Sequence, residues 1–145
     1  MVSIFAVCRD LADAPCDQTI RNALEATLPG ITELERRLNR SLATELPRAL
    51  FRKSRKIAID LTLIPYHGQP HLNEKEIYRS KPKSGTSHFH AYATAAVVHK
   101  GHRYTLALTH VEYGENMKTV VQRLLVIVRR RQVKVRFLLL DKGLF

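Results

Sequence analysis

Apolar and polar positions alternate along residues 57–63, which is the pattern of a β-strand with one buried face. Aliphatic side chains occupy positions 57, 59, 61 and 63, and Asp60 falls among the side chains that point the other way. Aspartate is a poor strand former, and it is rarely buried unless it is paired, hydrogen-bonded or bound to a metal. Asp60 is therefore the first candidate for a functional side chain.

A second carboxylate follows an apolar run near the other end of the chain. Residues 133–140 are apolar except at Lys134 and Arg136, and Asp141 comes directly after them. A run so uniformly apolar near its end predicts a central strand that is buried on both faces. Two aspartates carried by strands therefore frame the region between them.

Two further strands and a helix are predicted between these acids. Residues 88–99 and 104–111 have β-type patterns, and Lys100-Gly101 lies at the turn between them, so we expect a hairpin. Residues 115–131 carry a wide apolar stripe at helical spacing. Residues 65–87 contain three prolines and no sustained period, which predicts a long loop, and such a loop is more often functional than idle.

The residues before the first strand are predicted to be helical. Apolar side chains recur every three or four positions in residues 17–28 and again in residues 31–46, and Pro29-Gly30 separates the two helices. Pro47 interrupts the second helix and starts a short one over residues 47–50. We expect an N-terminal helical region, residues 1–55, as a candidate DNA-binding segment, followed by an α/β domain over residues 56–145.

The predicted order of elements is helices, three strands, a helix and a final strand. A helix between two strands of one sheet implies a right-handed crossover and parallel strands, so the last strand can lie beside the first. Asp60 and Asp141 would then be neighbours, because adjacent strands are about 4.8 Å apart, and two such carboxylates can share divalent cations. This βββαβ order is the layout of the ribonuclease H-like fold.

The net charge of +11 is concentrated in the second half of the chain. Residues 1–78 hold 11 Lys and Arg against 10 Asp and Glu, whereas residues 79–145 hold 13 against 3. Such a bias favours a polyanionic partner, most often nucleic acid, because each neutralised phosphate releases counterions. The two cysteines form no CxxC pair, and the first residues lack the pattern of a signal peptide, so we expect a soluble intracellular protein in a reducing compartment.

Three stretches together resemble a known family. Residues 59–68, residues 83–94 and the segment Leu139-Leu140-Asp141-Lys142-Gly143-Leu144-Phe145 are similar to DDE transposases of IS4-type insertion sequences, in the group related to ISH3. The likeness runs from about Lys56 to the end of the chain. The last motif of that family usually reads Asp-Arg-Gly-Phe-Tyr, so this chain departs from it mildly.

The resemblance implies a catalytic site and its cofactor. Asp60 and Asp141 match the two aspartates that bind Mg²⁺ or Mn²⁺ in that family. The resemblance also implies DNA transposition by two-metal phosphoryl transfer at transposon ends. The family supplies a third acid, a glutamate, from a helix beyond the fourth strand, and the chain stops at Phe145 before it. We therefore expect a truncated, inactive N-terminal part of a transposase, cytoplasmic and associated with a prokaryotic nucleoid. A homodimer or a complex with full-length transposase is a further expectation.

Basic and imidazole side chains near the predicted strands are the candidates for DNA contact. Arg52, Lys53 and Arg55 form a basic run before the first strand, which reads equally well as a solvated linker. The other candidates are Lys81, Lys83, His88, His90 and Lys142.

Two alternatives to a transposase remain open at the level of sequence. One is a non-catalytic basic protein that binds DNA and interferes with an intact transposase. The other is an unrelated basic α/β interaction module, in which Asp141 is a helix N-cap and Asp60 is a buried acid with satisfied hydrogen bonds.

Overall fold

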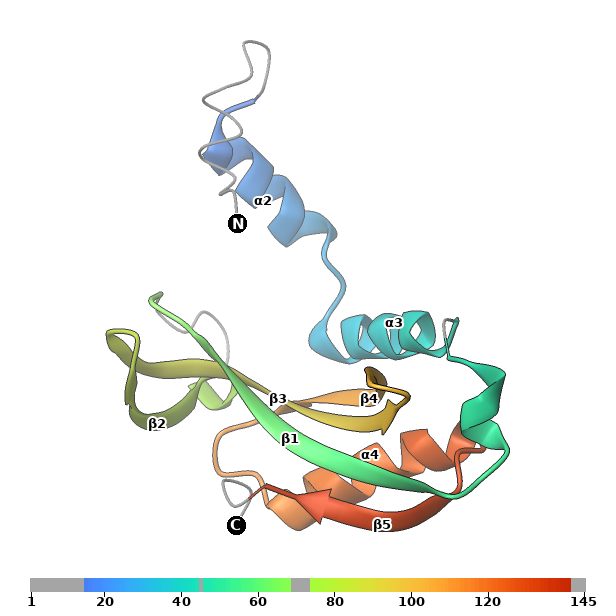
Figure 1. Ribbon diagram of the computed structural model, residues 1–145. Coiled ribbons are helices and arrows are strands. Elements are labelled where there is room, and N and C mark those ends of the chain that lie inside the picture. Colours follow the sequence, from blue (N-terminus) through green and yellow to red (C-terminus); the bar gives the residue numbers. More distant parts are fainter. Residues whose placement is uncertain (1–14, 45, 69–73, 142–145) are drawn as a thin grey trace. The chain divides into compact units, whose positions relative to one another are not determined.

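The computed structural model describes residues 15–44, 46–68 and 74–141 (Figure 1). In chain order its elements are α2 (Asp17–Thr27), α3 (Ile31–Thr44), η1 (Arg48–Phe51), β1 (Arg55–Pro65), η2 (Glu74–Glu76), β2 (Tyr78–Lys83), β3 (Thr86–His99), β4 (His102–Val111), α4 (Met117–Arg130) and β5 (Val135–Leu140). The chain divides into two compact units, Met1–Leu34 and Glu35–Phe145. The second unit has a mixed sheet with helices, which agrees with the predicted α/β class.

The first unit contains α2, a helix that the apolar spacing predicted. Asp17 forms an ion pair with Arg21 one turn later, at 3.5 Å. None of the residues of α2 is buried, and the side chains of Leu24 and Leu28 in the predicted stripe are exposed. The helix is thus confirmed, but its own residues add nothing to the buried core.

The sheet of the second unit has five strands in the order β2-β3-β1-β5, and β4 also pairs with β3. β3 is antiparallel to β1, β2 and β4, whereas β5 is parallel to β1. The prediction that the last strand lies beside the first is confirmed, and β3 of the hairpin lies on the other side of β1. The hairpin turns at Lys100 and Gly101, whose φ angles of 51° and 80° are those of a tight turn that glycine favours.

Alternate residues of β1 and β3 build the core on one face of the sheet. Ile57 and Ile59 are buried, and the antiparallel partner strand presents Ala91, Ala93 and Ala95 to the same core. These small side chains let α4 pack close to the sheet, where its buried residues are Val120, Leu124 and Val128. α4 therefore packs against the face of the sheet that carries this core. Figure 1 shows α4 lying along the sheet.

The sheet is larger than the sequence pattern indicated, because part of the expected loop is a strand. β1 continues to Pro65, and β2 forms within residues 65–87, pairing Tyr78 with Phe89 of β3. Ser84 and Gly85 turn the chain between β2 and β3, with φ angles of 53° and 77°. The prediction of a continuous loop is therefore wrong. β3 has 14 residues and extends beyond its pairing with β4, so its free end offers β2 a hydrogen-bonding partner.

The prediction that the last strand is central and buried on both faces is also wrong. Among the described residues, β5 pairs with β1 alone, so it lies at an edge of the sheet. Phe137 is 51% exposed and Leu139 is 55% exposed, and both are apolar. An apolar run shows that a strand favours burial, whereas the elements packed around it decide whether burial occurs.

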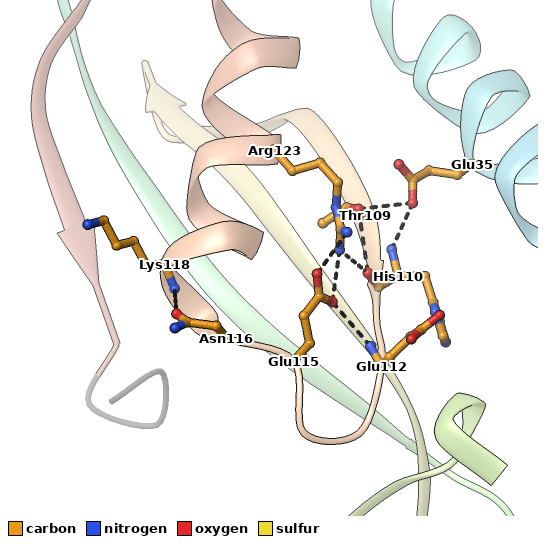
Figure 2. Close-up of polar contacts among 8 residues, drawn as sticks. All are labelled: Glu35, Thr109, His110, Glu112, Glu115, Asn116, Lys118 and Arg123. Carbon is orange, nitrogen blue, oxygen red and sulfur yellow. Dashed lines mark hydrogen bonds and ion pairs between the residues drawn. The ribbon is translucent and has the colours of Figure 1, made fainter.

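Side chains of α3 cover the outer edge of β4. Asn39 pairs with Leu108 as a strand would, because its amide donates to the Leu108 carbonyl at 2.7 Å and accepts from the Leu108 N–H at 3.0 Å. The carboxylate of Glu35 accepts from the Thr109 hydroxyl at 2.9 Å and from the His110 N–H at 3.0 Å (Figure 2). On the other side of His110, Arg123 of α4 donates to its carbonyl at 2.6 Å and to Glu115. Backbone groups at this edge thus have partners outside the sheet.

Replacing Asn39 by alanine is expected to destabilise the fold by about 1–3 kcal/mol, since the N–H and carbonyl of Leu108 both lose a partner. Alanine is the better helix former, so the change in helix propensity acts in the opposite direction. Urea unfolding measures the difference. Arg40→Ala, at an exposed position of the same helix, should stay within about 0.5 kcal/mol of the wild type, and equal losses in both variants would argue against the edge contact.

Candidate functional site

Asp60 lies in the middle of β1, on the face of the sheet that α4 does not cover. Its neighbours in the strand, Ile59 and Leu61, point toward the core, so the alternation turns Asp60 toward solvent. The side chain of Asp60 is 45% exposed. The predicted orientation, opposite the isoleucines, is confirmed.

Asp141 reaches the same place from β5. The parallel register pairs Ala58 with Leu139 and Ile59 with Leu140, so that Asp141 follows next to Asp60. The N–H of Asp141 donates to the carbonyl of Ile59 at 3.4 Å, which continues the ladder to this residue. Both aspartates line one open cavity of about 380 Å³, together with Ala58, Ile59, Ala96, Val98, Arg103, Leu139 and Leu140.

A cationic side chain shares the cavity with the two acids. Nη2 of Arg103, from the start of β4, lies 3.9 Å from Oδ2 of Asp60 and donates to the hydroxyl of Thr94 at 3.4 Å. Thr94 is the register partner of Asp60 on β3, so the three side chains lie on one face. Arg103 is not among the site residues predicted from the sequence. The register of the predicted hairpin, which pairs Arg103 with Val98, was the signal that places it on this face.

The two carboxylates suit a hard divalent cation, because Mg²⁺ and Mn²⁺ prefer oxygen ligands and keep several waters. The open cavity leaves room for those waters. Within residues 15–44, 46–68 and 74–141, no group of three or more His, Cys, Asp or Glu side chains converges on a metal position. Among these residues, Asp60 and Asp141 are the carboxylates that line the cavity.

The predicted DNA-contacting residues fall into different environments. Arg52, Lys53, Lys81 and Lys83 are exposed, and the last two lie on β2. Arg55 is structural instead: its guanidinium donates to the carbonyls of Ala49 and Leu50 and lies 3.3 Å from Nδ1 of His99, and so joins η1 to β1. Lys142 lies outside the described residues.

The two histidines in that set lie on β3 and are half-buried. The ring of His90 meets the ring of Tyr66 edge to face, with centroids 4.8 Å apart. Burial lowers the pKa of His90, and the nearby charge of His110 lowers it further, although Glu76 acts in the opposite direction. His90 therefore favours the neutral form, which offers little electrostatic attraction to a phosphate.

Comparisons with known proteins identify no relative: no protein-family model, no curated protein and no solved structure matches this chain. The helices in the described part of the chain include none that is both long enough and apolar enough to cross a membrane.

Proposed function

We propose that this chain belongs to a DDE transposase of the IS4 type and supplies two aspartates, Asp60 and Asp141, to its metal centre. The observation that carries the proposal is the pairing of β1 with β5, which brings both acids to one cavity although they are 81 positions apart in the sequence. Three antiparallel strands, a helix and a strand parallel to the first are the order that a ribonuclease H-like core has, and the observed strand pairing is compatible with it.

The reaction of such a site is an in-line displacement at a DNA phosphate. A bound Mg²⁺ or Mn²⁺ supplies the activation of water or a 3′-hydroxyl and stabilises the leaving oxygen. Asp60 and Asp141 bind the ion, and strand pairing fixes their backbones. The exposed apolar side chains of Val98 and Leu139 form part of the wall. DNA is the expected partner, because the chain carries a net charge of +11.

Two carboxylates leave the two-metal arrangement incomplete. Such catalysis uses ions about 3.5–4 Å apart, each with a fixed position, and a misplacement of about 1 Å can cost on the order of a hundredfold in rate. No third carboxylate of the described residues lines the cavity. The chain by itself is thus expected to bind one ion without cutting DNA.

A second candidate function is non-catalytic binding of DNA. It is favoured by the 13 basic against 3 acidic side chains in residues 79–145, and by the exposure of Lys81 and Lys83. Under this function the cavity has no need of a metal, so cation binding separates the two proposals.

Titration of the purified chain with Mn²⁺, followed by the electron paramagnetic resonance of the free ion, tests the metal centre. We expect one site, and we expect Asp60→Asn and Asp141→Asn each to weaken it by at least about tenfold, since each removes an anionic oxygen ligand. Glu112→Gln is the matched control, because it removes the same charge from an exposed residue that does not line the cavity.

Equal Mn²⁺ affinity in all four proteins would exclude the metal centre and leave non-catalytic DNA binding as the function. A plasmid-nicking assay in Mn²⁺ accompanies the titration. Nicking by the wild type that Asp60→Asn lacks would show that two carboxylates suffice for cutting, against the expectation stated above.

A further inference from the structure

Arg103 occupies a position that the proposed metal centre does not use. We propose that its guanidinium is a phosphate-binding group for the nucleic acid backbone, held beside Asp60 until a cation or a phosphate separates the two. This inference deepens the proposed function, since it assumes that nucleic acid lies over the cavity.

The strand register explains how a residue at the start of β4 reaches Asp60. Arg103 pairs with Val98 of β3, and Asp60 of β1 pairs with Thr94 of the same strand. The long side chain of Arg103 extends along β3 toward Thr94, which brings Nη2 to 3.4 Å from the Thr94 hydroxyl and 3.9 Å from Oδ2 of Asp60. Arg103 is thereby part of the wall of the cavity that holds both acids.

The contact with Asp60 is weak enough to be exchanged. Its N to O distance of 3.9 Å is longer than a hydrogen bond, and the two side chains are 56% and 45% exposed. Exposed ion pairs of this kind contribute little to stability, because water competes and both side chains lose freedom. A divalent cation on Asp60 would repel the guanidinium and occupy the same carboxylate oxygens, which frees Arg103.

Three other arginines of the chain donate to backbone carbonyls. Arg55 donates to the carbonyls of Ala49 and Leu50, Arg123 donates to the carbonyl of His110, and Arg131 donates to the carbonyl of Asn39. Arg103 has two long side-chain contacts in place of such backbone bonds. Its planar fork of five N–H donors matches phosphate oxygens in pairs, which a lysine cannot do.

A double-mutant cycle in the absence of metal tests the inference, with a fluorescent duplex of 20 base pairs as the probe and anisotropy at low salt as the readout. Asp60→Asn removes the competing anion and releases Arg103, so the duplex should bind more tightly. The gain should be smaller by about threefold or more in the Arg103→Gln background, because the released group is then missing. Arg103→Lys should give an intermediate gain, since it keeps the charge without the fork.

Arg130→Gln is the matched control, because it removes the same charge from an exposed position at the end of α4. Combined with Asp60→Asn, it should show no coupling. The inference would be overturned if the effects of Asp60→Asn and Arg103→Gln were additive, or if Asp60→Asn coupled as strongly to Arg130→Gln. It would also be overturned if the wild type did not bind the duplex. Circular dichroism measures whether each variant is folded. If Arg103→Gln unfolds, Arg103→Lys still tests the inference.

The Mn²⁺ titration distinguishes this inference from the proposed function. Arg103→Gln should raise Mn²⁺ affinity by about threefold, because a competing cation has left the carboxylate. If the aspartate variants bind Mn²⁺ as the wild type does while the DNA cycle shows coupling, the metal centre fails and the phosphate site stands. If Mn²⁺ binding depends on both aspartates while the DNA cycle is additive, the metal centre stands and the phosphate site fails.

Discussion

Binding of duplex DNA to this chain should fall by roughly a thousandfold when the salt concentration rises from about 50 mM to about 200 mM, if six basic side chains contact phosphates. The reason is release of condensed counterions, which is less favourable when bulk salt is high. Residues 79–145 carry 13 Lys and Arg against 3 Asp and Glu, which is more than enough for six contacts. Fluorescence anisotropy of a labelled duplex over a series of salt concentrations measures the slope of log K, the association constant, against the logarithm of the salt concentration.

This slope is also proportional to the number of phosphate contacts that the protein makes. Lys81 and Lys83 are exposed residues of β2. If both contact phosphates, a variant with Lys81→Gln and Lys83→Gln should have a slope that is shallower by about 1.8, because each contact contributes about 0.9. A duplex of unrelated sequence should bind as well as the first. Affinity that survives high salt and differs between the two duplexes would instead indicate recognition of base edges.

Shortening Leu124 to alanine should cost the fold about 2–5 kcal/mol, the range found when a buried leucine leaves a cavity behind. Leu124 is fully buried in the middle of α4, between Val120 and Val128. The alanines of β3 opposite this helix are too small to fill the space. Urea unfolding followed by circular dichroism measures the loss.

Val126 provides the control on the same helix. It is 46% exposed, so Val126→Ala should change the free energy of unfolding by no more than about 0.5 kcal/mol. If the two variants are equally stable, α4 does not pack on the sheet with the face described above. The orientation of the crossover that leads to Asp141 would then need revision.

The elements that could be predicted from sequence are those with a clear local signal. Alternation around Asp60 predicted β1, the helical spacing of Val120, Leu124 and Val128 predicted α4, and Lys100-Gly101 predicted the hairpin turn, all of which the structure contains. The neighbouring position of Asp60 and Asp141 followed from the parallel crossover and is confirmed by the register of β1 and β5.

The elements that were missed depend on partners distant in sequence. β2 has charged side chains and Pro82 where an alternating strand would have apolar ones, so its strand form depends on pairing with the far end of β3. Ser84-Gly85 is a turn signal of the same kind as Lys100-Gly101, but no apolar run precedes it. β5 shows the opposite error, since its apolar residues suggested burial that no described neighbour provides at Phe137 and Leu139.

In the site, the two acids were predictable and the arginine was not. Asp60 and Asp141 stand out because a carboxylate is unusual within or directly after a strand. Arg103 is an ordinary basic residue near a turn, and its approach to Asp60 depends on the register of two strand pairs and on the length of its side chain. The edge contacts of Glu35 and Asn39 likewise join residues about 70 positions apart in the chain and leave no local pattern.

The unequal edges of the sheet limit how copies of this chain can join through backbone pairing. Asn39 and Glu35 occupy the edge at β4, and β2 is six residues long and carries Arg79, Lys81, Pro82 and Lys83, which discourage pairing. In the described part of the chain, β5, which is also six residues long, is thus the apolar edge strand that is available. If two copies pair their β5 strands antiparallel about a twofold axis, the β5 edge of each copy is occupied by the other. Assembly through this edge therefore ends at a dimer and does not propagate into fibres.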